Sequence, residues 1–141
     1  MYRELYRPHL ALIQGLGGFL RQADQSGVLM AIGSAATNFN IDFVLDNLDI
    51  RSYFNAIVGA EDVIESKPDP EVFLKGAGLL GVEPESCVVF EDVPKGAEAA
   101  LNAGMSAIIV TTTHMEEEFA NYPNVLFFIS DYTDPRLAEL F

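Results

Sequence analysis

Three groups of polar side chains in this sequence have the chemistry needed to bind a phosphate group and a metal ion. Ser34 follows an apolar run, Lys67 lies in a proline-rich loop, and Glu91 and Asp92 follow another apolar run. A hydroxyl and the free amides that begin a helix bind anions. A lysine neutralises charge that builds up on the anion, and two carboxylates supply the hard oxygen ligands that Mg²⁺ prefers. The sequence therefore predicts a phosphate site with Mg²⁺.

Each group also has a purely structural interpretation. Ser34 or Thr37 would cap the helix that follows, which for these residues alone is the commoner role. Lys67 would be a solvated surface lysine, and Asp92 would cap the next helix. The acidic pair favours the metal instead, because two adjacent carboxylates at the tip of a buried strand are costly without a cation.

The elements that must position these residues alternate along the chain. We expect strands at 28–33, 53–59, 87–90, 107–110 and 126–129. We expect helices at 16–26, at 37–48, from the N-cap Asp69 to 80, from 92 to 104, and at 134–141. This alternation is typical of an α/β protein with a three-layer α/β/α, Rossmann-like parallel sheet. The continuous apolar run at 28–33 predicts a strand buried on both faces, and ligands of such sheets bind beyond the carboxyl ends of the strands.

The composition excludes several classes of protein. Half of the 141 residues are hydrophobic, which excludes a disordered chain. The net charge of −13 argues against nucleic acid and anionic membranes as partners, and no apolar run approaches the ~18 residues of a membrane span. Cys87 is the single cysteine, so we expect no internal disulfide and a cytoplasmic protein.

The chain resembles the haloacid dehalogenase superfamily, in its beta-phosphoglucomutase-like branch, through three segments in the family's order. They are Ala-Ile-Gly-Ser-Ala-Ala-Thr-Asn at 31–38, Ser-Lys-Pro-Asp-Pro-Glu-Val-Phe at 66–73, and Val-Val-Phe-Glu-Asp-Val-Pro-Lys-Gly-Ala-Glu-Ala-Ala at 88–100. The resemblance implies a Mg²⁺-dependent phosphatase or phosphomutase. Its substrate would be a small phosphorylated metabolite such as a sugar phosphate.

The resemblance also assigns roles to individual residues. Ser34 and the amide of Ala35 would hold the phosphoryl group, Asn38 would face it as in the sugar-phosphate mutases, and Lys67 would neutralise it. The acidic pair would hold Mg²⁺. Val93 in place of a common Ser, and Gln14 in place of a common Pro, put fine positioning in doubt but remove no ligand.

The family's first motif, Asp-x-Asp-Gly-Thr/Val, does not occur in the 141 residues. In the family this motif follows a strand in the middle of the sheet and carries the aspartate that is phosphorylated. We therefore expect residues 1–7 to end a helical cap and residues 8–141 to form a core without its first strand. Strands 28–33 and 87–90 would flank an open slot, and their unpaired edges would permit self-association.

Two functions remain open at this point. The intact protein would be the phosphoryl-transfer enzyme, with an N-terminal segment beyond this sequence. The 141-residue chain alone would be inactive, and the alternative is a non-catalytic remnant that serves as a binding or assembly module. A flavodoxin-like nucleotide-binding or receiver domain is not favoured, because no glycine-rich loop follows the first strand.

Overall fold

The computed structural model describes residues 14–141, so the expected cap segment at 1–7 lies outside the described residues. The α-helices are α2 (Leu16–Gln25), α3 (Asn38–Leu48), α4 (Glu71–Leu80) and α5 (Pro94–Asn102). The strands are β1 (Ala31–Gly33), β2 (Ala56–Val58), β3 (Val88–Glu91), β4 (Ser106–Val110) and β5 (Val125–Ile129). Short 3₁₀ helices occupy Arg51–Tyr53 (η1), Ala60–Asp62 (η2), Pro84–Ser86 (η3), Glu116–Phe119 (η4) and Pro135–Leu140 (η5). The alternation of strands and helices confirms the α/β class.

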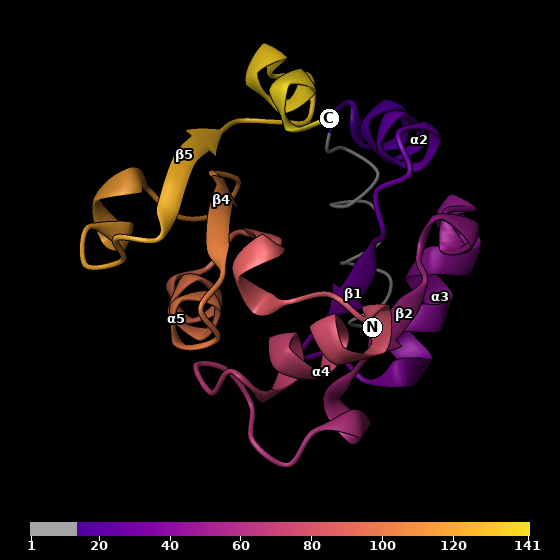
Figure 1. Cartoon of the computed structure of the whole chain (residues 1–141), viewed down its shortest axis with the longest axis horizontal. Helices are drawn as coiled ribbons and strands as arrows, with labels where there is room; N and C mark the ends of the chain where they lie inside the picture. The colour runs from indigo at the N-terminus through magenta and orange to yellow at the C-terminus, as the bar shows by residue number, and fades with distance from the viewer. Residues whose placement is uncertain (1–13) are drawn as a thin grey trace.

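The strands form two separate parallel sheets. β1 pairs with β2, and the other sheet has the order β3-β4-β5. Figure 1 shows β1 and β2 with α3 and α4 on one side of the molecule, and β4 and β5 with α5 on the other. Within residues 14–141, β1 pairs only with β2 and β3 only with β4, so each has one edge without a neighbouring strand. The strands that were expected to flank a slot thus belong to different sheets.

A shared core holds the two sheets together. α4 packs on β1 and β2, and α5 packs on β3 and β4. Val58 of β2, Phe73 of α4 and Ile109 of β4 are all buried in one cluster. Burial of a side chain of this size stabilises the fold by about 1.5–3 kcal/mol. The carboxyl ends of β1 and β3 therefore keep fixed positions although no strand pairing joins their sheets.

The prediction that 28–33 is buried on both faces is wrong. The strand begins only at Ala31, and the preceding Val28 and Leu29 are 39% and 48% exposed. The physical reason is the open edge of β1, since no strand of the described chain covers that side. An apolar run thus indicates a strand that is built for burial, whereas its actual burial depends on neighbours elsewhere in the fold.

Two helix predictions need correction. α4 begins at Glu71 with Pro70 at its cap position, so its boundary lies one residue later than expected. The Asp69 carboxylate still accepts the Glu71 amide at 3.0 Å, which is the contact that an N-cap residue makes. The last helix is the 3₁₀ helix η5, in which the Asp134 carboxylate caps the Arg136 amide at 2.9 Å. A segment this short gains little from regular α-helical hydrogen bonding.

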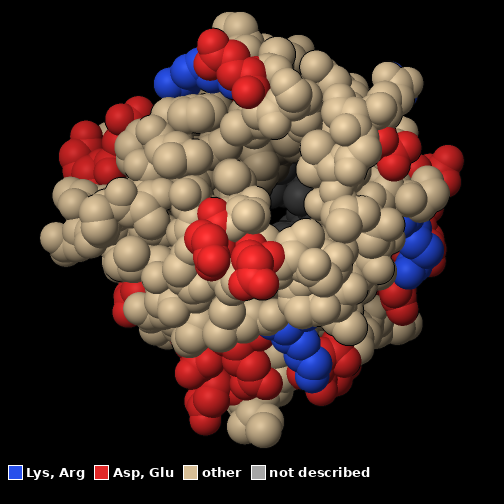
Figure 2. All heavy atoms as spheres, in the orientation of Figure 1, with Lys and Arg blue, Asp and Glu red and all other residues tan. Residues whose placement is uncertain are grey.

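Acidic side chains are spread over the surface. Figure 2 shows that they outnumber the basic ones on the face in view, which is hollowed near its centre. This distribution agrees with the net charge of −13. Among residues 14–141, none of the helices is both long enough and apolar enough to cross a membrane.

Candidate functional site

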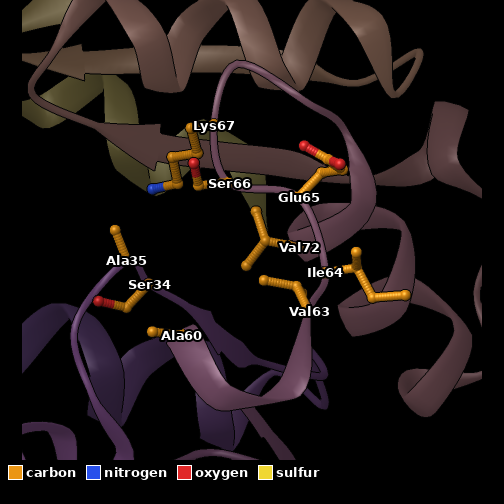
Figure 3. A pocket seen from close by; sticks show the side chains of 9 residues that line it. All are labelled: Ser34, Ala35, Ala60, Val63, Ile64, Glu65, Ser66, Lys67 and Val72. Atoms are coloured by element: carbon orange, nitrogen blue, oxygen red, sulfur yellow. The ribbon is translucent and has the colours of Figure 1, made fainter.

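A pocket of about 170 Å³ brings together residues that were predicted to bind phosphate (Figure 3). It is lined by Ser34, Ala35, Ala60, Val63, Ile64, Glu65, Ser66, Lys67 and Val72. Ser34 and Ala35 come directly after β1, and Lys67 lies in the loop before α4. Figure 3 shows the Lys67 ammonium and the Ser34 hydroxyl on the same side of the pocket, with Ala35 between them. The carboxyl end of β1 and the proline-rich loop thus meet at one site, as parallel topology requires.

The turn after β1 presents a free hydrogen-bond donor to this pocket. The Ser34 hydroxyl oxygen accepts the Ala36 amide at 3.0 Å, and the Thr37 hydroxyl oxygen accepts the Asn40 amide at 3.3 Å. Thr37 is therefore the N-cap of α3, whereas Ser34 tightens the turn. The Ala35 amide donates no hydrogen bond to any part of residues 14–141. A free amide beside a hydroxyl is an arrangement that suits an anion.

Asn38 lies outside the set of residues that line the pocket. Its backbone amide donates to Glu61 Oε1 at 2.8 Å, and its side-chain Oδ1 is buried against Gly59 without a hydrogen-bond partner in the described chain. The structure therefore joins Ser34, Ala35 and Lys67 at the pocket but does not bring Asn38 to them. Periodicity placed Asn38 at the start of α3 without showing which way its side chain turns.

Lys67 is not a solvated surface lysine. Its Nζ lies 2.6 Å from Glu91 Oε2, and the two side chains are only 13% and 10% exposed. The ammonium also lies 4.9 Å from the centroid of the Phe73 ring. Burial raises the pKa of the Glu91 carboxyl, while the charge of Lys67 and the hydrogen bond from it act in the opposite direction. The end of β3 is thereby linked directly to the loop that carries Lys67.

Gly96 leaves the space that the Glu91 side chain occupies. A Cβ at position 96 would overlap Glu91 Cγ and Cδ, so no larger residue fits without moving the carboxylate. Gly96 belongs to the first turn of α5, which packs on the strand that carries Glu91. The close approach of helix and strand that small residues predict is therefore used to enclose a charged side chain.

Asp92 does not cap the helix that follows it. α5 begins at Pro94, and its N-cap Val93 makes no side-chain cap, so the interpretation of Asp92 as the helix cap is wrong. The Asp92 carboxylate forms no hydrogen bond or ion pair with residues 14–141. Burial raises the pKa of Tyr132 to about 12, and the negative charges of Asp92 and Glu91 add to the rise. Tyr132, which periodicity did not single out, is therefore a neutral hydroxyl near the acidic pair.

The acidic pair suits a divalent cation as part of a donor set. No group of three His, Cys, Asp or Glu side chains in residues 14–141 has a metal-binding arrangement. Mg²⁺ keeps several waters and takes one or two carboxylates together with phosphate oxygens. Asp92 has a free carboxylate for that purpose, and Glu91 stands beside it with Oε2 bound to Lys67. The residues present thus fit Mg²⁺ only together with further ligands.

Two carboxylates that the sequence analysis did not single out hold the walls of the pocket. Glu61 binds the start of α3 through the Asn38 amide, and Glu71 binds the backbone of the loop that carries Lys67. The Ala60 amide also donates to the Ala36 carbonyl at 2.9 Å, which joins η2 to the turn after β1. Glu71 follows Pro70, a pattern that indicates only a helix start, so the sequence offered no signal for its contacts with the loop.

Comparison with known proteins places the chain in a family. The family model described as haloacid dehalogenase-like hydrolase matches residues 1–110. The chain is 43% identical over 81 residues to a fructose-1-phosphate phosphatase of Escherichia coli, with 57% of this chain and 43% of that protein covered. It is 33% identical over 129 residues to hexitol phosphatase B of Escherichia coli, with 92% and 55% covered. The chain therefore spans about half the length of these curated relatives.

A solved structure supports the same assignment. The crystal structure of beta-phosphoglucomutase from Clostridium difficile matches with a TM-score of 0.77 and 25% identity, and the match covers 91% of this chain and 55% of that one. On the family match and the shared fold, the chain belongs to the haloacid dehalogenase-like hydrolases.

Proposed function

We propose that this chain is the core of a Mg²⁺-dependent phosphoryl-transfer enzyme, a phosphatase or phosphomutase that acts on a small phosphorylated metabolite. A sugar phosphate is the substrate class that the relatives favour, because they are named fructose-1-phosphate phosphatase, hexitol phosphatase and beta-phosphoglucomutase. We place the protein in the cytoplasm because its single cysteine suits a reducing compartment.

The observation that carries the proposal is the meeting of Ser34, Ala35 and Lys67 at one pocket. The Ser34 hydroxyl and the Ala35 amide donate hydrogen bonds to two phosphoryl oxygens, and the Lys67 ammonium neutralises the charge that develops during transfer. The volume of about 170 Å³ suits a phosphate group rather than a whole sugar phosphate. The sugar would extend out of the pocket.

Asp92, with Glu91 beside it, would hold Mg²⁺ at the neighbouring strand end. The ion, when bound, supplies positive charge that stabilises the transferring phosphoryl group. Glu91 has a second role, because its ion pair fixes the Lys67 ammonium at the pocket. The pair also cancels much of the charge of Lys67, so the chain with net charge −13 needs the amide donors and the cation to attract a phosphate.

The nucleophile lies outside these 141 residues in this proposal. We propose that residues 8–141 form the core and that a further strand, carrying the family's phosphorylated aspartate, inserts between β1 and β3. The edges of both strands that no strand of residues 14–141 pairs with support this arrangement. The apolar side chains of Val28, Leu29 and Val88, each about 40–50% exposed, are suited to being covered by such a strand.

The same edges favour a second candidate, a binding or assembly module without catalysis. An uncovered strand edge pairs readily with another chain, so copies of this polypeptide would self-associate through β1 or β3. Sedimentation over a range of protein concentrations tests this candidate. A chain that stays monomeric at high concentration would exclude self-assembly through these edges.

Two measurements test the enzyme proposal. In the presence of Mg²⁺, the 141-residue chain should bind inorganic phosphate in isothermal titration, and Lys67→Met should abolish the binding. Protein purified from its natural source should hydrolyse p-nitrophenyl phosphate with Mg²⁺, and the same substitution in that full form should abolish turnover. No phosphate binding by the chain, together with no turnover by the natural form, would overturn the proposal.

A further inference from the structure

The span of residues 63–65, which leads to Lys67, depends on one carboxylate for its backbone hydrogen bonds. Glu71 Oε1 accepts the Ile64 amide at 3.0 Å and the Glu65 amide at 2.9 Å, and its Oε2 lies 3.1 Å from the Ile64 amide. Within the described chain, these are the only hydrogen bonds made by the backbone of residues 63–65. Ile64 is 91% exposed, so its side chain contributes little packing to hold the segment.

The two sides of this segment are anchored independently. On the N-terminal side, the Asp62 carboxylate accepts the Gly59 amide at 2.8 Å, and Lys75 Nζ donates to the Asp62 carbonyl at 2.5 Å. On the C-terminal side, Asn102 Nδ2 donates to the Pro68 carbonyl at 3.0 Å. Residues 63–65 therefore form a span between fixed ends. That span supplies three of the residues that line the pocket and leads directly to Lys67.

We infer that Glu71 is a positioning residue for the anion pocket, holding the 63–65 span so that Lys67 faces the Ser34–Ala35 turn before phosphate arrives. The inference rests on the proposed function and deepens it. A charged acceptor forms stronger hydrogen bonds with backbone amides than a neutral one. A pocket whose wall is already ordered avoids the entropic cost of ordering it when the ligand binds.

The ionisation of Glu71 is consistent with this role. The backbone hydrogen bonds from Glu65 and Ile64 lower its pKa, with a further contribution from the charge of Lys75. The carboxylate is therefore charged at neutral pH, and it remains charged at lower pH than an ordinary glutamate does. Its contacts do not depend on Lys67 itself, because the two side chains share no hydrogen bond or ion pair.

The test compares Glu71→Gln with a matched control, Glu118→Gln. Glu118 Oε2 accepts the Met115 backbone amide at 2.8 Å, and its pKa is likewise lowered, but it lies in the segment of η4 that does not line the pocket. We expect Glu71→Gln to weaken the binding of inorganic phosphate by roughly tenfold, the factor that corresponds to about 1.4 kcal/mol of ordering cost. Glu118→Gln should bind phosphate as the unmodified chain does.

Amide hydrogen exchange separates positioning from a general loss of stability. In the unmodified chain the Ile64 and Glu65 amides should be protected without phosphate. In Glu71→Gln they should exchange rapidly and become protected when phosphate is added, which a merely structural role would not produce. Suppose that Lys67→Met binds no phosphate but Glu71→Gln binds it as tightly as the unmodified chain does. That result would overturn this inference and leave the proposed function standing. No phosphate binding by the unmodified chain would overturn the proposed function and this inference with it.

Discussion

Lys67 Nζ lies 2.6 Å from Glu91 Oε2, and this ion pair joins the proline-rich loop to the end of β3. The two residues are 24 positions apart in sequence. Lys67 precedes α4, which packs on β1 and β2, whereas Glu91 belongs to β3 of the other sheet. Each side chain is about nine-tenths buried, so each charge depends on the other for compensation. The pair is thus a structural link that fixes the Lys67 ammonium at the pocket, while Glu91 cancels much of its charge.

The first prediction concerns the stability that this pair provides. Lys67→Met leaves the Glu91 carboxylate buried without its partner and should lower the free energy of unfolding by about 3–5 kcal/mol. Urea denaturation measures the change. The double variant Lys67→Met/Glu91→Gln removes both charges and should recover most of the loss. If the single variant is as stable as the unmodified chain, the charge of Glu91 does not depend on Lys67 for compensation.

The second prediction concerns the space above Gly96. Gly96→Ala puts a methyl group where Glu91 Cγ and Cδ lie, so it should destabilise the fold by about 1–3 kcal/mol through overpacking. This cost exceeds the gain of up to about 1 kcal/mol that alanine brings to a helix. Gly78→Ala in α4 is the matched control, because a Cβ there meets nothing within 4 Å, and it should stabilise the chain. Thermal unfolding measures both variants. Midpoint temperatures that shift in the same direction in the two variants would contradict the prediction.

The third prediction separates the anion site from the helix cap that follows it. Ser34→Ala removes a hydroxyl at the pocket and should weaken phosphate binding about tenfold, as expected for a hydrogen bond to a charged group. Thr37→Ala removes the N-cap of α3 and should lower the free energy of unfolding by about 1 kcal/mol while phosphate affinity stays the same. Calorimetric titration and urea denaturation provide the two readouts. Equal loss of phosphate affinity in both variants would contradict the prediction, because it would show that Ser34 affects phosphate binding only by stabilising α3.

The fourth prediction concerns acid sensitivity at η5. Hydrogen bonds from the Arg136 side chain and amide lower the pKa of Asp134 to about 2 from an ordinary value of 3.8. A lowered pKa in the folded state stabilises the fold above the unfolded-state value, and this contribution disappears as the pH falls toward 2. Asp134→Asn should therefore be less stable than the unmodified chain above about pH 4, with the difference closing toward pH 2. A difference that stays constant down to pH 2 would contradict the assignment.

Much of the fold could be predicted from local patterns. The apolar runs located all five strands, because a buried parallel strand needs continuous hydrophobic residues. Helical periodicity, caps and glycine stops together located α2 to α5 within a few residues. The ends of elements were less certain, as Pro70 at the cap of α4 shows, because proline followed by a carboxylate is compatible with more than one start.

The candidate site was also predicted only in part. The order of Ser34, Lys67 and the acidic pair after successive apolar runs predicted where phosphate chemistry would gather, since parallel strands bring their carboxyl ends to one side of the fold. The direction of each side chain could not be predicted. Asn38 turns toward Gly59, Glu91 turns under α5 to reach Lys67, and Asp92 is left without a partner in the described chain.

The sequence by itself determined the α/β class, the family resemblance and the candidate residues, because these depend on residue types and spacing within short segments. Only the tertiary structure decided which candidates share a pocket, because that depends on packing between segments distant in sequence. It also decided that β1 and β3 lie in separate sheets, each with one edge that no strand of residues 14–141 covers. The hydrogen bonds of Glu71 with the loop backbone are visible only in the tertiary structure, since a carboxylate that binds a loop backbone has no signature in the spacing of residues.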